Sequence, residues 1–438
     1  MELVRTKQGM FRGAVKDGYT VFYGIPYGEA PVGDARFLEP AQALPFQGER
    51  DCTHPSVRPW MADPKEDSAV AKEFYFHRDY WLPRDEDSLQ LHIWTPARQP
   101  GEKLPVAVWI HGGAFQKGYG TEVETDGEGF CARDVILVSI EYRMGIFGFF
   151  CHPWLSEEPF GGKGNLGLLD QIEALKWVRD NIEAFGGDPG RVTIIGQSAG
   201  AISVQILASS PLARGLFHGA VMQSGGGYQS PVSVVREMGE AWKLGEEFTE
   251  YAGIHSLEEL RQMPAERLCQ MADEFQARTC RSMAFAPVID GYVLTDSLDG
   301  IIEGSGHGDI PYLMGSNLDD LYTEELAAAL ERFAQKNRRL HKPPVYLYRF
   351  EQIPPASQEG MYAGSYHSAE LWYVFETCRR GSRPYGREDL ALSKEMADCW
   401  CSFVKDGNPD PDGKLGWSFY RSRDDIYRFY GGRTNEGN

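Results

Sequence analysis

The chain has 438 residues and a formal net charge of −19, from 44 Lys and Arg against 63 Asp and Glu. This acidic balance argues against nucleic acid and anionic membrane surfaces as partners, because both would repel the chain at long range. Hydrophobic residues make up 42% of the chain and charged residues 24%, which suits a large core and gives no signature of disorder. We therefore expect a globular protein.

The sequence also carries no signal for export or membrane insertion. The first residues, MELVRTKQGMFRGAVKDG, are charged throughout and contain no apolar stretch typical of a signal peptide. Apolar runs such as DVILVSI are far shorter than the roughly 20 residues that a membrane helix needs. The eight cysteines are too sparse for a disulfide scaffold and contain no CxxC pair. We expect reduced thiols and a cytoplasmic location.

Alternating strands and helices are predicted along the chain. Apolar runs predict buried strands at residues 106–110, 135–140, 192–195, 220–222, 312–314 and 345–348. Apolar residues from Leu168 to Phe185 recur every three or four positions, which predicts a helix that ends at Gly186. This pattern is typical of a mostly parallel sheet covered by helices on both faces. Residues 234–280 are charged and helical in pattern, which suggests a helical cap inserted into a single domain spanning residues 1–438.

A candidate nucleophile follows the strand VTII, in Gly196-Gln197-Ser198-Ala199-Gly200. The apolar segment AISVQILASS comes next and can form a helix, so Ser198 lies on a tight turn between a strand and a helix. Glycines two residues to either side leave room for such a turn, which lifts the serine hydroxyl clear of the sheet. The helix N-terminus adds partial positive charge where an oxyanion would develop. The pattern alone is weak, but its context favours a catalytic serine.

A second motif, which could supply the oxyanion hole for this serine, follows the strand VAVWI, in His111-Gly112-Gly113-Ala114-Phe115. The backbone N–H groups of Gly112 and Gly113 can face a tetrahedral intermediate without interference from a Cβ atom. Together with the N–H of Ala199 they would form an oxyanion hole. An ordinary glycine turn is the alternative, and the agreement of the two motifs argues against it.

A serine hydroxyl needs a base, and the base needs an orienting carboxylate. Among ten histidines, His367 has the best position, in a loop of small residues after the nucleophile. Asp319 and Asp320 follow the strand PYLM, where the C-terminal edge of a parallel sheet presents its active site. Asp320 gives the chain order Ser, Asp, His of the α/β-hydrolases. We favour Asp320 and leave a contribution from Asp319 open.

Several longer segments make the resemblance specific. FYGIPYGEAPVGDARF, EDSLQLHIWTP, EYRMGIFGF, GNLGLLDQIEALKWVRDNIEAFGGDPGRVTIIGQSAG and the HSAEL segment resemble the type-B carboxylesterase family, the cholinesterase-like branch of the α/β-hydrolases. The match spans about residues 4–420. It implies an α/β-hydrolase fold with Ser198 as nucleophile, His367 as base and Asp320 as acid. It also implies Gly112, Gly113 and Ala199 as oxyanion donors.

The resemblance implies further structural residues. Arg36 with Glu86 and Arg143 with Asp170 are similar to the two structural ion pairs of the family, and Ser224 is similar to a hydroxyl that lies beside the triad. The chain also departs from the family. Many secreted members have a cysteine where this chain has Ser88, so Cys52 lacks its expected partner, and Asp320 stands where Glu is commoner. The missing cysteine agrees with a reducing compartment.

These observations predict a serine carboxylesterase that acts on a small-molecule ester through an acyl-enzyme and needs no metal or organic cofactor. One alternative is a hydrolase with the same triad that is specialised for amides, carbamates or lipids. A second is a cholinesterase-like binding module without catalysis. The sequence does not indicate the acyl chain, the alcohol or the oligomeric state.

Overall fold

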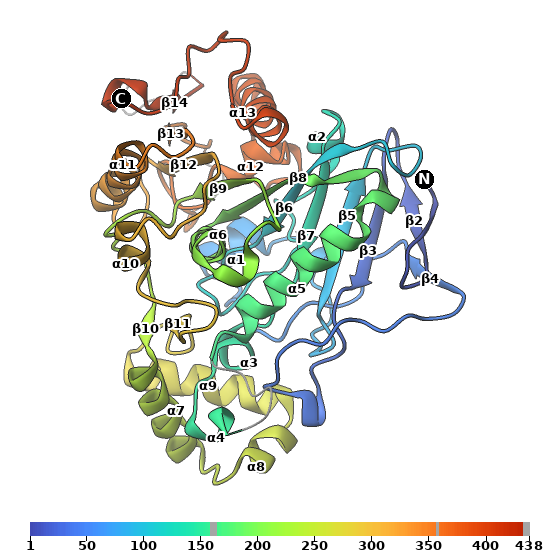
Figure 1. Ribbon diagram of the computed structural model, residues 1–438, viewed down its shortest axis with the longest axis vertical. Coiled ribbons are helices and arrows are strands. Elements are labelled where there is room, and N and C mark those ends of the chain that lie inside the picture. The colour runs from blue at the N-terminus through green and yellow to red at the C-terminus, as the bar shows by residue number, and fades with distance from the viewer. Residues whose placement is uncertain (158–163, 356–358, 432–438) are drawn as a thin grey trace.

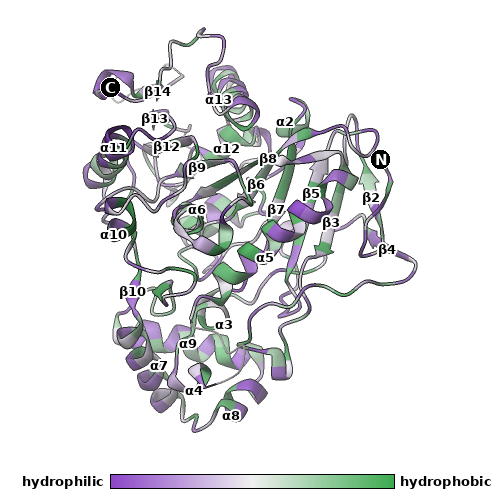
Figure 2. Cartoon of the chain, viewed as in Figure 1, coloured by the Kyte–Doolittle hydropathy of each residue, from purple (hydrophilic) through white to green (hydrophobic). Residues whose placement is uncertain are grey.

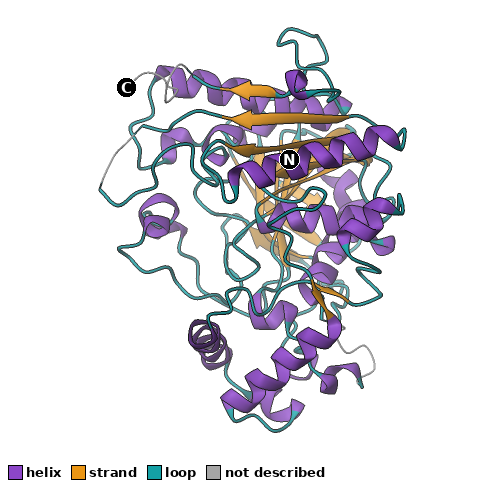
Figure 3. Cartoon of the chain, turned by 90° about the vertical axis from the view of Figure 1, so that its left-hand side faces the viewer, coloured by secondary structure: helices purple, strands orange, loops and turns teal. Residues whose placement is uncertain are grey.

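A long twisted sheet runs through the molecule, with helices on both sides (Figures 1 and 3). The computed structural model describes residues 1–157, 164–355 and 359–431. Within these ranges twelve strands form one sheet in the spatial order β1-β2-β3-β5-β7-β6-β8-β9-β12-β13-β14, and β4 pairs with β2. Its strands are β1 (Leu3–Arg5), β2 (Met10–Val15), β3 (Thr20–Pro26), β4 (Glu49–Cys52), β5 (Gln90–Thr95), β6 (Leu104–Ile110), β7 (Ile136–Ile140), β8 (Gly187–Gln197), β9 (Gly219–Gln223), β12 (Tyr312–Asn317), β13 (Val345–Phe350) and β14 (Tyr427–Phe429).

The sheet changes character at β7. Along the path from β1 to β7 each neighbouring pair is antiparallel, whereas all the pairs from β7 to β14 are parallel. Strands β6, β7, β8, β9, β12 and β13 contain the six predicted apolar runs, and all six lie in the parallel part. The predicted mostly parallel α/β-hydrolase sheet is therefore confirmed, with a mixed N-terminal edge.

Two separate cores explain why the strands are apolar without alternation. On β6, Val106, Val108 and Ile110 belong to one core, while Ala107 and Trp109 belong to the other. Because successive side chains of a strand point to opposite faces, both faces of the sheet are buried. The first core includes residues of α5, α6, α10 and α11, and the second includes residues of α2, α12 and α13.

The helices that flank the sheet lie between its strands in the order of the chain. Helix α5 ends at Asn181, and a short 3-10 turn carries the chain to Gly186, whose φ of 87° ends the helical segment as predicted. The helices are α1 (Ala69–Phe74), α2 (Glu128–Cys131), α3 (Gly145–Phe149), α4 (Pro153–Ser156), α5 (Leu166–Asn181), α6 (Ala199–Ser209), α7 (Met238–Ala252), α8 (Leu257–Gln262), α9 (Ala265–Thr279), α10 (Leu298–Glu303), α11 (Thr323–Arg339), α12 (Leu371–Val374) and α13 (Arg387–Asp406). In the described residues, no helix combines the length and apolarity that a membrane crossing requires.

Helices α7, α8 and α9 form a separate layer at one end of the molecule (Figure 1). Strands β10 (Arg236–Glu237) and β11 (Val288–Ile289) pair at its base, where the chain leaves and rejoins the main body. Hydrophilic residues mark the outer surfaces of these helices (Figure 2). Gln276 of α9 donates to Gln116 at 3.2 Å, so this layer contacts the turn that follows β6.

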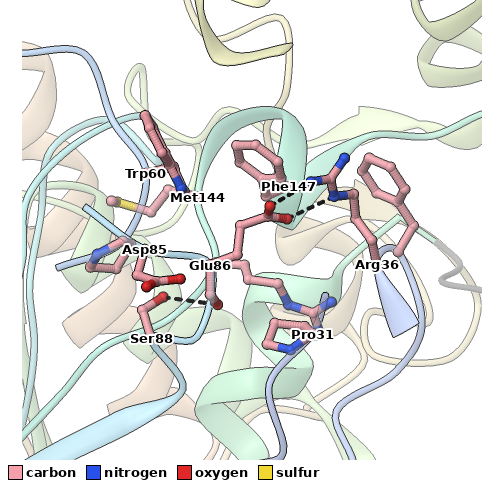
Figure 4. Close-up of a pocket in the computed structure, with 11 residues that line it drawn as sticks. Pro31, Arg36, Trp60, Asp85, Glu86, Ser88, Met144 and Phe147 are labelled. Carbon is pink, nitrogen blue, oxygen red and sulfur yellow. Dashed lines mark hydrogen bonds and ion pairs between the residues drawn. The ribbon is translucent and has the colours of Figure 1, made fainter. Parts of the chain in front are cut away.

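Two buried ion pairs connect distant parts of the chain. Arg143 forms two hydrogen bonds to Asp170, at 2.8 and 2.7 Å, and both side chains are buried. Arg36 forms a bidentate pair with Glu86, and Figure 4 shows the two groups facing each other with Ser88 beside Glu86. Arg36 also donates to the carbonyl of Met263 at 2.6 Å. The second pair therefore ties the α8–α9 connection to the N-terminal part of the chain.

Candidate active site

Ser198 occupies the sharp turn between β8 and α6, and its backbone is strained. Its φ of 55° and ψ of −122° lie outside the regions that residues with a Cβ atom favour. Its N–H donates to the carbonyl of Gln223 on the neighbouring strand at 2.8 Å, which helps to hold the turn. Strained backbone of this kind is concentrated at functional sites, where the surrounding structure maintains it.

The flanking glycines are required by contacts with backbone. A Cβ atom on Gly196 would lie 2.3 Å from the carbonyl oxygen of Gly200, and one on Gly200 would lie 2.1 Å from the carbonyl oxygen of Ile110. Both contacts are far shorter than atoms tolerate. The glycines therefore allow the turn to close over the end of β6, as the sequence pattern predicted.

The glycine turn after β6 lies directly against Ser198. A Cβ atom on Gly112 would be 3.2 Å from the Cβ atom of Ser198. Gly113 has a φ of 103°, and its carbonyl accepts from the N–H groups of Gln116 and Lys117, both at 3.0 Å. Ala114, which the sequence analysis did not single out, has a φ of 58° and also faces the site. Only the structure reveals this residue, since alanine gives no sequence signal of a left-handed backbone.

His367 and Asp320 meet although they lie 47 positions apart in the sequence. The Nδ1 atom of His367 is 2.6 Å from Oδ1 of Asp320. The neighbouring Asp319 points elsewhere and accepts from the N–H of Ser365 at 2.7 Å. Of the two carboxylates left open by the sequence, the structure therefore brings Asp320 to the histidine.

Asp320 is buried, yet its surroundings favour the ionised form. Burial raises the pKa of its carboxyl group, whereas the hydrogen bond and charge of His367 lower it. The side chain of Ser224 and the N–H of Asn317, which donates at 2.9 Å, lower the pKa further. The net result is a pKa below the usual value, so Asp320 is charged at neutral pH. Ser224 thus lies beside Asp320.

The second ring nitrogen of His367 faces Gln197. The two atoms Nε2 of His367 and Nε2 of Gln197 are 3.3 Å apart, which requires the ring nitrogen to accept. Burial lowers the pKa of His367, but the hydrogen bond and charge of Asp320, with a smaller effect of Glu370, raise it above 6.5 overall. Nδ1–H therefore points to Asp320, and the lone pair of Nε2 accepts from the side-chain amide of Gln197.

Glu370 is a second buried carboxyl group near His367 that the sequence analysis missed. It accepts from the side-chain amides of Asn317 at 2.5 Å and Gln223 at 3.3 Å. Burial, together with the negative charge of Asp320, raises its pKa to about 7. The HSAEL segment contained this residue, but nothing in its spacing indicated a contact with β9 or β12.

A cavity of about 310 Å³ contains Ser198, His367 and the glycine turn. It lies at the low end of the volumes typical of small-molecule sites. Aromatic side chains from α1 and from the segment before α12 make much of its wall. The lining residues are Val70, Phe74, Tyr75, Trp109, Gly112, Gly113, Ala114, Lys117, Gly118, Glu122, Glu124, Gln197, Ser198, Leu321, Tyr362, His367, Ser368 and Leu371. Helices α7, α8 and α9 contribute none of them.

Comparison with known proteins gives a consistent relationship along the chain. The model of the Carboxylesterase family matches residues 1–328 and 321–431. The chain is 32% identical to the para-nitrobenzyl esterase of Bacillus subtilis (strain 168), over 96% of this chain and 92% of that protein. It is 31% identical to the fumonisin B1 esterase of Sphingopyxis macrogoltabida, over 98% of this chain and 86% of that protein.

Solved structures agree with the sequence relatives. Carboxylesterase EST55 of Geobacillus stearothermophilus, solved at pH 6.8, superposes with a TM-score of 0.83 and 31% identity, over 98% of this chain and 96% of that one. These relatives favour ester hydrolysis over the amide, carbamate, lipid and non-catalytic alternatives. The chain belongs to the carboxylesterase family and is a carboxylic ester hydrolase with an α/β-hydrolase fold.

Proposed function

We propose that the chain hydrolyses small to medium carboxylic esters through an acyl-enzyme on Ser198, with His367 as base and Asp320 as orienting acid. The observation that carries this proposal is the pairing of His367 with Asp320 at 2.6 Å, in a cavity that also contains Ser198 on its strained turn. The cavity volume of about 310 Å³ supports the limit on substrate size.

In the first half of the reaction, Oγ of Ser198 attacks the ester carbonyl while Nε2 of His367 takes the hydroxyl proton of Ser198. The backbone N–H groups of Gly112, Gly113 and Ala199 donate to the developing oxyanion, and the N–H of Ala114 on the same turn is a further donor. The imidazolium is stabilised by the charge of Asp320 and returns the proton to the leaving alcohol.

In the second half, water attacks the acyl-enzyme and gives a proton to Nε2 of His367. The acid leaves and Ser198 regains its proton. Nε2 must turn from Gln197 toward Ser198 or the water in each half, so we assign Gln197 a positioning role. Every proton transfer in this cycle uses residues of the chain itself.

The test is the hydrolysis of p-nitrophenyl esters, from acetate to laurate, by the purified protein and by Ser198→Ala. We expect turnover with short and medium chains and a loss of roughly 10⁶-fold in kcat in the variant, as for removal of a catalytic serine elsewhere. A circular dichroism spectrum checks that the variant is folded. Comparable turnover by wild type and variant would refute the assignment of Ser198.

We also propose the domain organisation, the location and the kind of partner that the sequence predicts. We propose one catalytic domain over residues 1–438 with a cap over about residues 234–280, supported by the layer of α7, α8 and α9. We propose a cytoplasmic location, supported by eight cysteines that are all free thiols. The net charge of −19 supports a small-molecule ester, and not a nucleic acid or an anionic membrane, as the partner.

A further inference from the structure

Two carboxyl groups outside the triad line the cavity that contains Ser198. Glu122 and Glu124 lie on the segment between the glycine turn and α2, and their exposed fractions are only 9% and 4%. Buried carboxyl groups are expensive and are normally paired with a cation. In the part of the chain that the structure describes, neither Glu122 nor Glu124 forms an ion pair.

The polar groups around the pair are only partly satisfied. The hydroxyl of Tyr75 donates to Glu122. Oε2 of Glu124 is buried and has no hydrogen-bond partner among the described residues, and the same holds for Nε1 of Trp109, which is 1% exposed and lines the same cavity. Protein interiors rarely leave such atoms unpaired. Oε2 of Glu124 is an acceptor, so on the wall of a substrate cavity it points to a hydrogen-bond donor on the ligand.

The neighbouring charged residues do not neutralise the pair. Glu73 is held by Arg383, and Glu141 accepts from the N–H of Gly120 at 2.8 Å and faces His92 at 3.2 Å. Arg58 lowers the pKa of Glu122, but its guanidinium pairs with Asp63. In the described structure, neither Glu122 nor Glu124 therefore has a cation of its own as an ion-pair partner.

Lys117 is the one cationic side chain among the residues that line the cavity in the described structure. Burial raises the pKa of Asp273 on α9, and the charge of Lys117 partly opposes this effect, so Lys117 acts toward the cap. It is not among the groups with the largest effects on the pKa of Glu122 or Glu124.

The protonation of the pair follows from this environment. Burial raises the pKa of Glu122 to about 7, although the hydroxyl of Tyr75 opposes the change. Burial and the adjacent Glu122 raise the pKa of Glu124 well above its usual value. Without a ligand, the two groups therefore hold protons near neutral pH. A cation bound beside them would favour the ionised forms and displace a proton.

We propose that Glu122 and Glu124 bind an ammonium group carried by the acyl or alcohol part of the ester. An ammonium group with N–H donors supplies both the positive charge and the hydrogen bond that Oε2 of Glu124 lacks. The proposal deepens the ester hydrolysis proposed above and rests on it. It makes these two residues determinants of specificity, and it leaves the steps at Ser198 unchanged.

The first test compares p-nitrophenyl esters of ω-ammonio acids with esters in which a methyl group replaces the ammonium group. A second series places the same pair of groups on the alcohol of an acetate ester. We expect kcat/KM to favour the ammonium ester of at least one series. In the double variant Glu122→Gln with Glu124→Gln, the ratio of ammonium to methyl ester should fall about tenfold, which is about 1.4 kcal/mol.

The control is Glu128→Gln, which removes one negative charge at the first residue of α2, four positions after Glu124. The Glu128 side chain is 63% exposed and does not line the cavity, so the variant should keep the wild-type ratio. A ratio that falls equally in Glu128→Gln would mean that the total charge of the protein, and not the cavity, causes the preference, and would overturn the proposal.

A binding measurement separates this proposal from the proposed catalysis. Hexylammonium is titrated into the Ser198→Ala protein by calorimetry at about pH 6.5, in two buffers with different heats of ionisation. Binding with proton release, lost in the variant that also carries both Gln substitutions, supports the pair. Hexanol is the neutral control and should release no proton.

The outcomes are distinct. Ester turnover without a change of the ammonium ratio in the double Gln variant, or hexylammonium binding without proton release, would overturn the ammonium site while ester hydrolysis stands. Absence of any ester turnover, together with proton-linked binding of hexylammonium that needs Glu122 and Glu124, would support the site and overturn the catalytic proposal.

Discussion

Glycine at position 198 should make the protein more stable than alanine does, the reverse of the usual order inside a helix. Ser198 has a φ of 55° and a ψ of −122°. Alanine keeps the strain of this backbone, which amounts to about 1–3 kcal/mol in comparable residues. Glycine relieves it but adds about 0.5–1 kcal/mol of unfolded-state freedom. We therefore expect Ser198→Gly to exceed Ser198→Ala in stability by about 0.5–2 kcal/mol.

Both variants lack the nucleophile, so their difference reports the backbone alone. The assay is equilibrium unfolding in urea, followed by tryptophan fluorescence and circular dichroism in parallel. A matched control is Ala327→Gly in α11, where ordinary helical backbone should make glycine cost about 1 kcal/mol. The two comparisons should thus have opposite signs.

An Ala variant at position 198 that equals or exceeds the Gly variant in stability would refute the reasoning. It would mean that the turn relaxes when the serine is removed, and that the strain belongs to the side chain and not to the fold. Coincident transitions by both probes are required before the free energies are compared.

Three further predictions concern the base, a buried ion pair and the turn. Asp320→Asn should lower kcat about 10⁴-fold. It should also move the acid limb of the profile of kcat/KM against pH to lower pH. The reason is that Asp320 raises the pKa of His367, and only the neutral ring acts as base. Arg143→Met should cost about 3–5 kcal/mol in urea unfolding because it leaves Asp170 buried and unpaired, and Asp170→Asn added to it should recover part of the loss. Gly200→Ala should destabilise the fold by about 1–3 kcal/mol and lower kcat, since its Cβ atom meets backbone at 2.1 Å.

The parts of the fold that depend on local sequence were predictable. The six apolar runs marked six of the seven strands in the parallel part, with β14 missed, and the helical segment after residue 166 ended at its glycine. Gly196 and Gly200 marked the turn of Ser198 because only a missing Cβ atom permits their contacts. The antiparallel edge from β1 to β5 was not predicted, because its strands are short or interrupted and carry little periodic signal.

Residues that act through contacts between distant elements were not predictable from their positions. Glu370 faces amides of β9 and β12, and Glu122 faces Tyr75 of the segment that follows α1. A single Glu in a sequence is normally solvated, so burial is the property that distinguishes these residues. The choice between Asp319 and Asp320 depended in the same way on which carboxylate the fold turns toward His367.

The two buried carboxyl groups nearest His367 differ in charge because their donors differ. Burial raises the pKa of both, yet Asp320 is hydrogen-bonded to His367 and to the N–H groups of Asn317 and Leu321, whereas the side-chain partners of Glu370 are the neutral amides of Asn317 and Gln223. Asp320 is therefore ionised at neutral pH, while the pKa of Glu370 is about 7. One full charge beside His367 stabilises the imidazolium during the reaction. A second full charge would hold the proton on the ring between turnovers, so a partly protonated Glu370 keeps His367 available as a base.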